Sequence, residues 1–416
     1  MATGSYSEVP RLPYEDTDFE INYKTKASEQ EILDGERARL RLQNTYGNLK
    51  HDNRLIAGDN LKVLRTLSDD PTVSGKVRLI YIDPPYATGF RFQSTTVGVA
   101  YDDVDRGATY LEVFRKRLVL LRELMSSDGS IYVHLDVNMI FPVKLLMDEV
   151  FGSSTFRNLI TRVKCNSKNQ VRRQFGDVCD YLLFYCSSTN NLWNNPIIPW
   201  GPLEGEKEYN SVESDTGRRF KKVPCHLSGV RNGKTGSDWN GRPPPPGKHW
   251  VHSPEKLNEL DEQGRIYWSP TGNPRRKLYL DESTGKRRSN LWTDFRDTQN
   301  QNARVTGYPT EKNYEMMRMI VESSSSPDDL VLDAYAGSGT TLAAADDIGR
   351  RWIGIDSSAV AIATASERLR YGTPLMGSYA RKSYIQRKPD QKPKDTYTAF
   401  QVWFDEDMDD NSIETN

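Results

Sequence analysis

Two short segments of this chain have residue types suited to chemistry: one could activate an amino group on a nucleobase, and the other could hold a nucleotide-like ligand. The first is Asp83-Pro84-Pro85-Tyr86, which directly follows the apolar run 77–82. An exocyclic amino group on a base is a poor nucleophile because its lone pair is conjugated into the ring. Asp83 and the Pro84 carbonyl, whose direction the prolines restrict, offer two acceptors for the amino hydrogens and would free that lone pair. Tyr86 adds an aromatic face for a flipped base. The alternative is a Pro-Pro turn that ends a strand and binds nothing.

The second segment is the glycine-rich run DAYAGSGTT, residues 333–341, between an apolar strand-like run and a helix-like run. Gly337 and Gly339 allow close backbone approach to a ligand, and the following helix N-terminus offers free N–H groups. Asp356 closes the next apolar run at a spacing typical of an acidic residue that binds ribose hydroxyls. The run is neither GxxxxGK[ST] nor a full GxGxxG. S-adenosylmethionine, with an ammonium, a sulfonium and a ribose, suits Asp333 and Asp356, although a tight turn without a ligand is the alternative.

The elements that must position these segments alternate between strand and helix. Hydrophobic periodicity predicts a helix over 28–47, with Ser28 as N-cap and Glu31 completing a capping box. Such alternation predicts an α/β fold with a mostly parallel sheet and helices on both faces. The further predicted elements are a strand, turn and helix over 54–67, strands over 76–82 and 129–136, helices over 109–127 and up to Phe151, and a strand-helix-strand-helix unit over 329–369.

The amino-acid composition of the chain changes after residue 157, where Pro, Gly, Trp and basic residues dominate. Four consecutive prolines in NGRPPPPGKHW, residues 240–250, exclude regular helix or central strand there. We therefore predict an irregular insert over 158–304 between two parts of one core, 28–157 and 305–370. Residues 1–27 are predicted to be poorly ordered, and residues 371–416 to form a loosely packed polar tail.

Composition limits the class of protein. The chain has 416 residues, 36% of them hydrophobic and 27% charged, with a formal net charge of −1. The polar N-terminus and the lack of a long apolar run predict a cytoplasmic protein without a membrane span. The four cysteines show no CxxC spacing, so we expect reduced thiols, and Cys225, His226, His249 and His252 do not form a paired metal-ligand pattern. No metal site is predicted.

Charge is unevenly distributed and points to a polyanion. Residues 160–300 contain 23 Lys and Arg against 16 Asp and Glu. A cationic segment attracts nucleic acid even when the whole chain is nearly neutral. The tryptophans of the same segment, Trp239, Trp250, Trp268 and Trp292, are interpreted as core residues, with stacking on nucleobases as the alternative. The candidate DNA-binding residues are Arg172, Arg173, Arg275, Arg276, Lys277, Arg287 and Arg288.

In combination and in this order, the motifs resemble those of the beta-class amino-group DNA methyltransferases, in which the catalytic motif precedes the cofactor loop. The matching segments are AGDNL (57–61), DPPYATG (83–89), GSIYVHLD (129–136), YPTEK (308–312), DAYAGSGTT (333–341) and RRWIGID (350–356). The insert is similar to the target-recognition region of modification subunits. The resemblance implies a Rossmann-like class I methyltransferase fold, S-adenosylmethionine as cofactor and double-stranded DNA as partner.

The resemblance also implies roles for single residues. Asp83, Pro84, Pro85 and Tyr86 would be the catalytic quartet. Asp59 and Asn60 would lie at the cofactor adenine, Asp356 at its ribose and Lys312 near its carboxylate. The methionine end would be held by Asp333, Ala336, Gly337, Ser338, Gly339 and Thr340. Tyr335 stands where the family usually has Phe, which keeps an aromatic ring.

The chemistry implied is methylation of adenine N6 in a specific DNA sequence, because Ser in place of Asp83 is commoner in the cytosine enzymes. Cytosine N4 methylation, methylation of RNA or of a protein glutamine, and a catalytically silent DNA-binding subunit are the alternatives. The chain is expected to act as an orphan methylase or as the modification component of a restriction or phage-defence system. A homodimer is typical of the family.

Overall fold

The computed structural model describes residues 20–23, 25–48, 52–85, 108–166, 173, 175–297, 306–373 and 399–408. Within it the chain divides into two compact units. One unit comprises residues 1–194 and 289–416, and we call it the core unit. The other comprises residues 195–288 and is called the insert unit.

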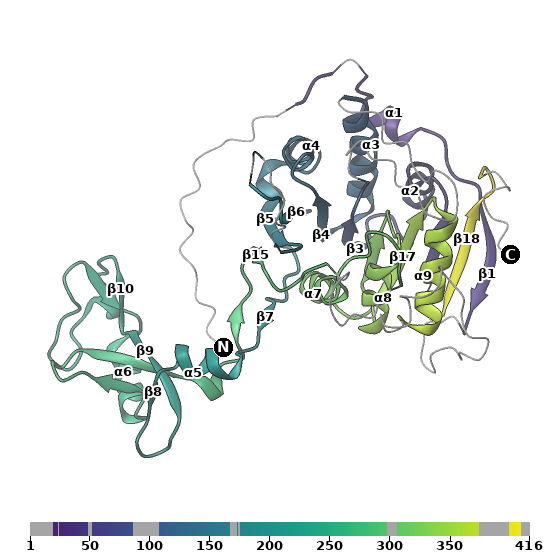
Figure 1. Cartoon of the computed structure of the whole chain (residues 1–416). Coiled ribbons are helices and arrows are strands. Elements are labelled where there is room, and N and C mark those ends of the chain that lie inside the picture. Colours follow the sequence, from purple (N-terminus) through teal and green to yellow (C-terminus); the bar gives the residue numbers. More distant parts are fainter. Residues whose placement is uncertain are drawn as a thin grey trace. The chain divides into compact units, whose positions relative to one another are not determined.

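A ten-stranded sheet forms the centre of the core unit (Figure 1). In spatial order the strands are β1 (Leu40–Tyr46), β18 (Phe400–Asp405), β2 (Arg54–Ala57), β17 (Arg351–Asp356), β16 (Leu330–Asp333), β3 (Val77–Ile82), β4 (Met125–Leu135), β6 (Cys179–Cys186), β5 (Phe156–Val163) and β15 (Leu291–Trp292). Neighbouring strands are parallel from β18 through β4, and antiparallel strands lie toward both edges. Strands β2, β17, β16 and β3 are apolar along nearly their whole length because both faces of the sheet are covered.

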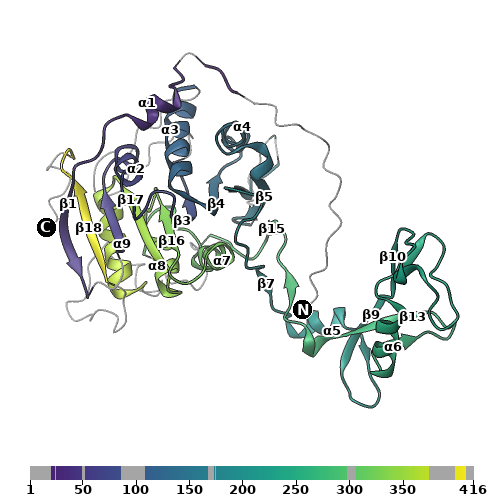
Figure 2. The same ribbon diagram turned by 180° about the vertical axis from the view of Figure 1, so that it is seen from behind.

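Helices cover both faces of this sheet, as predicted (Figures 1 and 2). Apolar residues of α2 (Asn60–Ser68), α3 (Ala108–Leu124) and α4 (Ile140–Phe151) share one buried cluster with the sheet. Those of α7 (Tyr314–Ser324), α8 (Thr340–Asp347) and α9 (Ala359–Tyr371) belong to a second cluster. Of the helices in the described part of the chain, none has the length and apolar character needed to cross a membrane.

The predicted helix over 28–47 is wrong after its first turn. The capping box is present in α1 (Glu29–Leu33), where Ser28 Oγ accepts from Glu31 N at 3.2 Å and the Glu31 carboxylate accepts from Ser28 N at 2.8 Å. Arg65 then donates to the carbonyl oxygen of Ile32 at 2.6 Å and satisfies the end of this short helix. The segment that follows forms β1, whose partner β18 comes from the other end of the chain.

That pairing also corrects the prediction of a loosely packed tail over 371–416. Phe400 and Val402 of β18 are buried, because the strand lies between β1 and β2 in the core sheet. At the other end of the chain, Ile21 N donates to Glu149 at 2.8 Å and Ala27 N to Glu112 at 3.0 Å. Residues 20–23 and 25–27 are therefore held against α3 and α4, contrary to the prediction of poor order. Residues 1–19 lie outside the described part.

The core sheet takes in residues that the predicted boundary at 157 placed in the insert. Strands β5 and β6 pair with each other, and β6 pairs with β4. On its return to the core unit the chain adds β15 beside β5. The insert unit is correspondingly shorter than the predicted range 158–304.

The insert unit contains an antiparallel sheet in the order β12 (Ile266–Trp268), β13 (Pro274–Tyr279), β9 (Arg219–Pro224), β8 (Ser211–Val212). Helix α6 (Pro254–Glu262) contributes Leu257 to a small core with Ile266 and the buried Trp239 and Trp250. These tryptophans are core residues, as interpreted from the sequence. The remaining helices and strands are α5 (Pro202–Glu208), and β7 (Ile197–Ile198) paired with β14 (Lys286–Arg287) and β10 (His226–Ser228) with β11 (Lys248–Trp250).

Candidate active site

Asp83 directly follows β3 at the carboxyl edge of the core sheet. Because β3 is parallel to β16 and to β4, the ends of these strands bring Asp83, Asp333 and His134 to the same edge. Pro84 is buried, and the Pro85 carbonyl accepts a hydrogen bond from the Tyr110 hydroxyl at 2.8 Å. The fourth predicted catalytic residue, Tyr86, lies outside the described residues.

The carboxylate of Asp83 is held by a cation. Lys312 Nζ lies 2.5 Å from Asp83 Oδ2, and the Asp83 side chain is 18% exposed. Lys312 belongs to the YPTEK segment, which the sequence placed near the carboxylate of a cofactor. The structure adds that this ammonium reaches Asp83 and restricts where its side-chain oxygens can lie.

Next to Asp83 lies a buried network of polar side chains. Tyr81 OH is 2.7 Å from His134 Nδ1, and His134 Nε2 lies 3.0 Å from Asp180 Oδ2. Arg162 donates to both oxygens of Asp180, at 2.7 and 2.5 Å, and contacts Asp297 at 2.7 Å. This network comes close to the predicted catalytic residue Asp83, since His134 Nδ1 is 4.0 Å from Asp83 Oδ1.

Burial and ion pairing set the charges of His134 and Asp180 in this network. Burial lowers the pKa of His134, which keeps the imidazole neutral, although Asp180 opposes the shift. Burial also disfavours ionisation of Asp180, yet His134 and Arg162 together hold its pKa well below the usual range. Asp180 and Tyr81 thus flank the imidazole of His134, with Asp180 Oδ2 3.0 Å from Nε2 and the Tyr81 hydroxyl 2.7 Å from Nδ1. The sequence did not reveal this network, because Arg162 and Asp180 fell within the predicted insert.

The predicted glycine loop connects β16 to α8. Asp333 is buried at the end of β16, where it accepts from Tyr335 N at 3.0 Å and from Thr341 Oγ1 at 2.6 Å. Gly337 and Gly339 have φ values of 48° and 71°, a region that side chains disfavour. A Cβ at Gly339 would lie only 2.8 Å from the Cβ of Ala365 on α9. Glycine is therefore required at Gly339 both for its backbone conformation and for the close packing of α9.

Two carboxylates flank the loop. Asp356, at the end of β17, accepts from Gly337 N at 2.8 Å and from Ser358 N at 2.9 Å. Burial raises the pKa of Asp356, and burial raises that of Asp333 to about 7, with smaller contributions from Asp83 and Asp356. A cation bound beside Asp333 would therefore favour its ionised form.

The predicted adenine-side residues lie at the start of α2. Asp59 caps this helix by accepting from Leu61 N at 3.0 Å, and it contacts Arg117 at 3.1 Å. Asn60 donates to the carbonyl oxygen of Ala334 at 2.8 Å. Asn60 thus links the AGDNL segment to the strand end that carries Asp333.

A buried ion pair, which the sequence did not predict, connects the glycine loop to α9. Arg368 of α9 lies 2.5 Å from Glu311, and it donates to the Ser338 carbonyl at 3.0 Å and to Thr340 Oγ1 at 2.8 Å. Glu311 in turn accepts from the backbone and hydroxyl of Thr306, both at 2.7 Å. Arg368 therefore joins the YPTEK segment to the glycine loop. The only signal in the sequence was an arginine on the inner face of a predicted helix.

These residues suit the chemistry of S-adenosylmethionine. Asp333 and Asp356 are acceptors for an ammonium and for ribose hydroxyls, and the glycine loop permits close approach of a ligand to the backbone. Gly337 has room beside it, because even an added Cβ would remain 3.6 Å from the Tyr308 ring. The donor and acceptor set present is therefore compatible with this cofactor.

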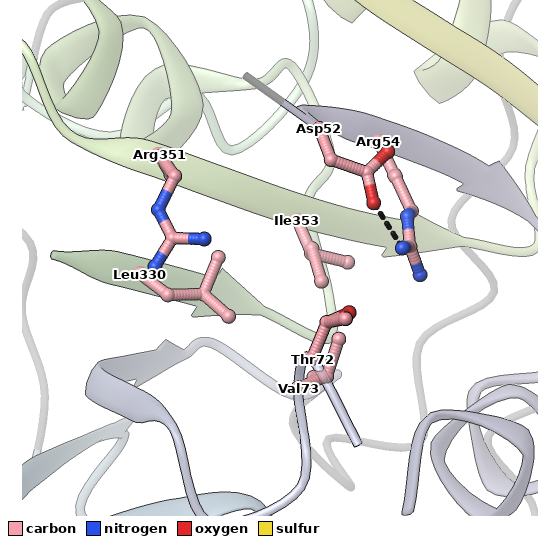
Figure 3. A pocket seen from close by; sticks show the side chains of 7 residues that line it. All are labelled: Asp52, Arg54, Thr72, Val73, Leu330, Arg351 and Ile353. Carbon is pink, nitrogen blue, oxygen red and sulfur yellow. Dashed lines mark hydrogen bonds and ion pairs between the residues drawn. The ribbon is translucent and has the colours of Figure 1, made fainter. Parts of the chain in front are cut away.

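A cavity of about 190 Å³ lies elsewhere in the core unit (Figure 3). It is at the amino ends of the strands, since Arg54, Leu330 and Arg351 are the first residues of β2, β16 and β17. Asp52, Thr72, Val73 and Ile353 complete its lining. This hollow is at the sheet edge opposite to Asp83 and Asp333 and has no part in the site described above.

The predicted DNA-binding residues are not brought together as one group. Neighbouring positions of β13 alternate between the faces of its sheet, so Arg276 points opposite to Arg275 and Lys277. Lys277 pairs with Glu213 at 2.7 Å, and Arg276 contacts His252 at 3.3 Å. Arg287 lies in β14, Arg288 N donates to Pro196 at 3.0 Å, and Arg173 is exposed in the core unit. Arg172 lies outside the described residues.

Comparison with known proteins agrees with the motifs. The family model for DNA methylases of the N6/N4 type matches residues 77–367. The chain is 45% identical to the Type II methyltransferase M.EcaI of Enterobacter cloacae over 90% of this chain and 82% of that protein. It is 25% identical to the StyLTI Mod subunit of a Salmonella typhimurium Type III restriction-modification enzyme, over 72% of this chain and 50% of that subunit.

Among solved structures, the M1.HpyAVI–SAM complex matches with a TM-score of 0.42 and 15% identity, over 76% of this chain and 98% of that one. The cytosine-N4-specific PvuII DNA methyltransferase matches with a TM-score of 0.42 and 13% identity, over 77% of this chain and 90% of that one. The extent of the family match, together with the identity to M.EcaI, decides the assignment: this chain belongs to the family of S-adenosylmethionine-dependent N6/N4 DNA methyltransferases.

Proposed function

We propose that this enzyme methylates the exocyclic N6 of an adenine within a specific sequence of double-stranded DNA, after flipping the base out of the helix. The observation that carries the proposal is an aspartate, Asp83, at the sheet edge beside the Asp333 loop, paired with Lys312 at 2.5 Å. A serine at this position is commoner in enzymes that methylate cytosine N4.

In this proposal, the residues of the quartet orient and activate the amino group. Asp83 and the Pro84 carbonyl accept its two hydrogens, which draws the nitrogen toward tetrahedral geometry and frees its lone pair. Lys312 fixes the direction of the Asp83 side chain, and Tyr86 stacks on the flipped base. Bound S-adenosylmethionine would supply a methyl group on a positively charged sulfur, which leaves as a neutral thioether when the S–C bond breaks. Asp83 takes up the proton that the amino nitrogen loses when the new N–C bond forms.

The same proposal assigns the cofactor contacts. Asp333 and the loop Ala336, Gly337, Ser338, Gly339 and Thr340 hold the methionine end, Asp356 the ribose, and Asp59 and Asn60 the adenine. Lys312 lies near the cofactor carboxylate as well as Asp83. The ties of Arg368 to Ser338, Thr340 and Glu311 support this assignment, because they fix the loop and the YPTEK segment to one helix.

The identity of the methylated base tests the proposal. Purified protein is incubated with tritiated S-adenosylmethionine and unmethylated genomic DNA, and the DNA is then digested to nucleosides. Label in N6-methyldeoxyadenosine is expected, with none transferred by Asp83→Ala. Label in N4-methyldeoxycytidine would overturn the adenine assignment, and transfer to RNA or protein but not to DNA would overturn the substrate class. Equal labelling by Asp83→Ala would overturn the role of the quartet.

We further propose that the insert unit recognises the target sequence and that the chain is the modification component of a restriction or defence system. The names of the relatives, a Type II methyltransferase and a Type III Mod subunit, support this proposal. The chain spans about half the length of the Type III Mod subunits that it matches. Single-molecule sequencing of DNA from cells that express the protein would give the target motif, and light scattering would test for a homodimer.

A further inference from the structure

The two faces of the insert-unit sheet differ in what covers them. Directly paired residues share a face, so Lys222 with Lys277 and Tyr267 with Arg275 lie on one side. Ile266 lies on the opposite side, where it packs with Leu257 of α6. We call the side that carries Lys222, Tyr267, Arg275 and Lys277 the basic face.

Charge on the basic face is only partly neutralised. Lys222 and Lys277 stand directly opposite each other on β9 and β13, an arrangement of like charges that destabilises a sheet. Lys277 has Glu213 at 2.7 Å. Lys222 and Arg275 are exposed, and neither has a carboxylate partner within the part of the chain that the structure describes. A repulsive pair at the centre of a small sheet is relieved when an anion binds over it.

Other cations of the same sheet form ion pairs with carboxylates of the insert unit. Lys221, the neighbour of Lys222 on the opposite face, lies 2.7 Å from Glu208. Arg219 lies 3.3 Å from Glu206. The unpaired charge of β9 is thus concentrated at Lys222, on the face that α6 does not cover.

Aromatic rings hold the lysines of the basic face in place. Lys222 Nζ lies 3.9 Å from the centroid of the Tyr267 ring and 5.9 Å from that of Phe220. Lys277 Nζ lies 5.4 Å from the Phe220 centroid. A cation–π contact orders an ammonium without neutralising it, so Lys222 keeps its charge and its N–H donors for a ligand.

We propose that the basic face binds the phosphate backbone of duplex DNA, with Lys222 and Arg275 as phosphate ligands and Tyr267 as the residue that positions Lys222. The inference rests on the proposed function for its choice of polyanion. Contacts to phosphate fix the register of a protein on DNA but carry no sequence information. The basic face therefore contributes affinity for any duplex, and base recognition belongs to other residues.

The salt dependence of DNA binding tests this assignment in the full chain. Lys222→Gln, Arg275→Gln and the double variant are compared with Lys221→Gln, the matched control one residue away on the other face. Dissociation constants for a labelled duplex are measured by fluorescence anisotropy between about 50 and 200 mM salt. Each single variant is expected to lower the slope of log Kd against log salt by about one, and the double variant by about two. Lys221→Gln is expected to bind as the wild type does.

The outcomes separate this inference from the proposed function. Wild-type slope and affinity in the double variant, with an unchanged melting temperature, would overturn the basic face as a phosphate site. An equal loss in Lys221→Gln would overturn the assignment to this face. Reduced slopes would support the basic face whichever base is methylated, whereas label in cytosine would overturn only the adenine proposal.

Discussion

The two sheets of this protein place functional groups in different ways. The core sheet is covered by helices on both faces, so its central strands are apolar and polar groups gather where those strands end, as at Asp83, Asp333 and Asp356. The insert-unit sheet packs Ile266 against α6 on one side and exposes Lys222 and Arg275 on the other. Phe220 and Tyr279 are buried on that second side, next to the exposed cations. A sheet buried on both sides offers only its edge to a ligand, whereas a half-covered sheet offers a face. The edge of the core sheet suits the precise placement of catalytic groups. The exposed face of the insert-unit sheet suits attraction of DNA without regard to its sequence.

The largest expected effect tests the edge. Asp83→Ala should reduce kcat for DNA methylation by about 10³-fold or more, because it removes both an amino-hydrogen acceptor and a proton acceptor. Cofactor binding, measured by calorimetry, should persist because Asp83 is assigned to the base. Asp83→Asn serves as the isosteric comparison. A rate within tenfold of wild type in Asp83→Ala would show that the edge carboxylate is not central to the reaction.

The next effect tests what holds the edge together. Arg368→Met should lower the free energy of unfolding by about 3–5 kcal/mol, because it leaves Glu311 buried without its partner. Arg368→Met with Glu311→Leu should recover part of this loss, because it removes the unpaired charge. Urea denaturation of the full chain measures both variants. Equal stability of Arg368→Met and wild type would rule out a structural role for this ion pair.

A smaller effect is specific to pH. Burial raises the pKa of Asp333 to about 7, so its ionisation destabilises the folded protein progressively as pH rises from about 4 toward 7. At about 1.4 kcal/mol per pKa unit the shift is worth up to about 4 kcal/mol, and loss of the acceptor for Thr341 Oγ1 offsets about 1–3 kcal/mol of it. Asp333→Asn should therefore stabilise the protein at pH 8 by about 1–3 kcal/mol, as seen in thermal melts.

Cofactor affinity should show the opposite preference. If the cofactor ammonium contacts Asp333, binding requires the ionised carboxylate. In the wild type, log Kd should therefore rise by about one for each unit that the pH is lowered below 7. Asp333→Asn should bind weakly with no such slope. Calorimetry from pH 5 to 7 checks this, and an unchanged slope in the variant would place the ammonium elsewhere.

The smallest effect tests the basic face. Tyr267→Leu removes the ring under Lys222 and should lower the stability of the insert unit by about 0.5–1 kcal/mol. Tryptophan fluorescence reports this unfolding, because Trp239, Trp250 and Trp268 lie in this unit. Phe at the same position should restore most of the loss. A drop in Tyr267→Phe as large as that in Tyr267→Leu would show that the hydroxyl, not the ring, is what matters.

The sequence predicted the alternation of strands and helices over the core correctly, because each of those elements satisfies its periodicity locally. It also identified the turn at Gly337 and Gly339, whose positive φ values only glycine adopts readily. It failed at 40–46 and 400–405, where each segment becomes a strand only through its distant partner.

Local sequence alone determined the apolar strands, the Asp-Pro-Pro corner and the glycine turn, since these depend on side-chain type and backbone restriction within a few residues. Only the tertiary structure decided that Lys312 reaches Asp83, that Arg162 and Asp180 lie behind it, and that Arg275 and Arg276 point to opposite faces. Those relations depend on strand order and pleat, because pairing brings together residues far apart in the chain and separates residues that are adjacent in it.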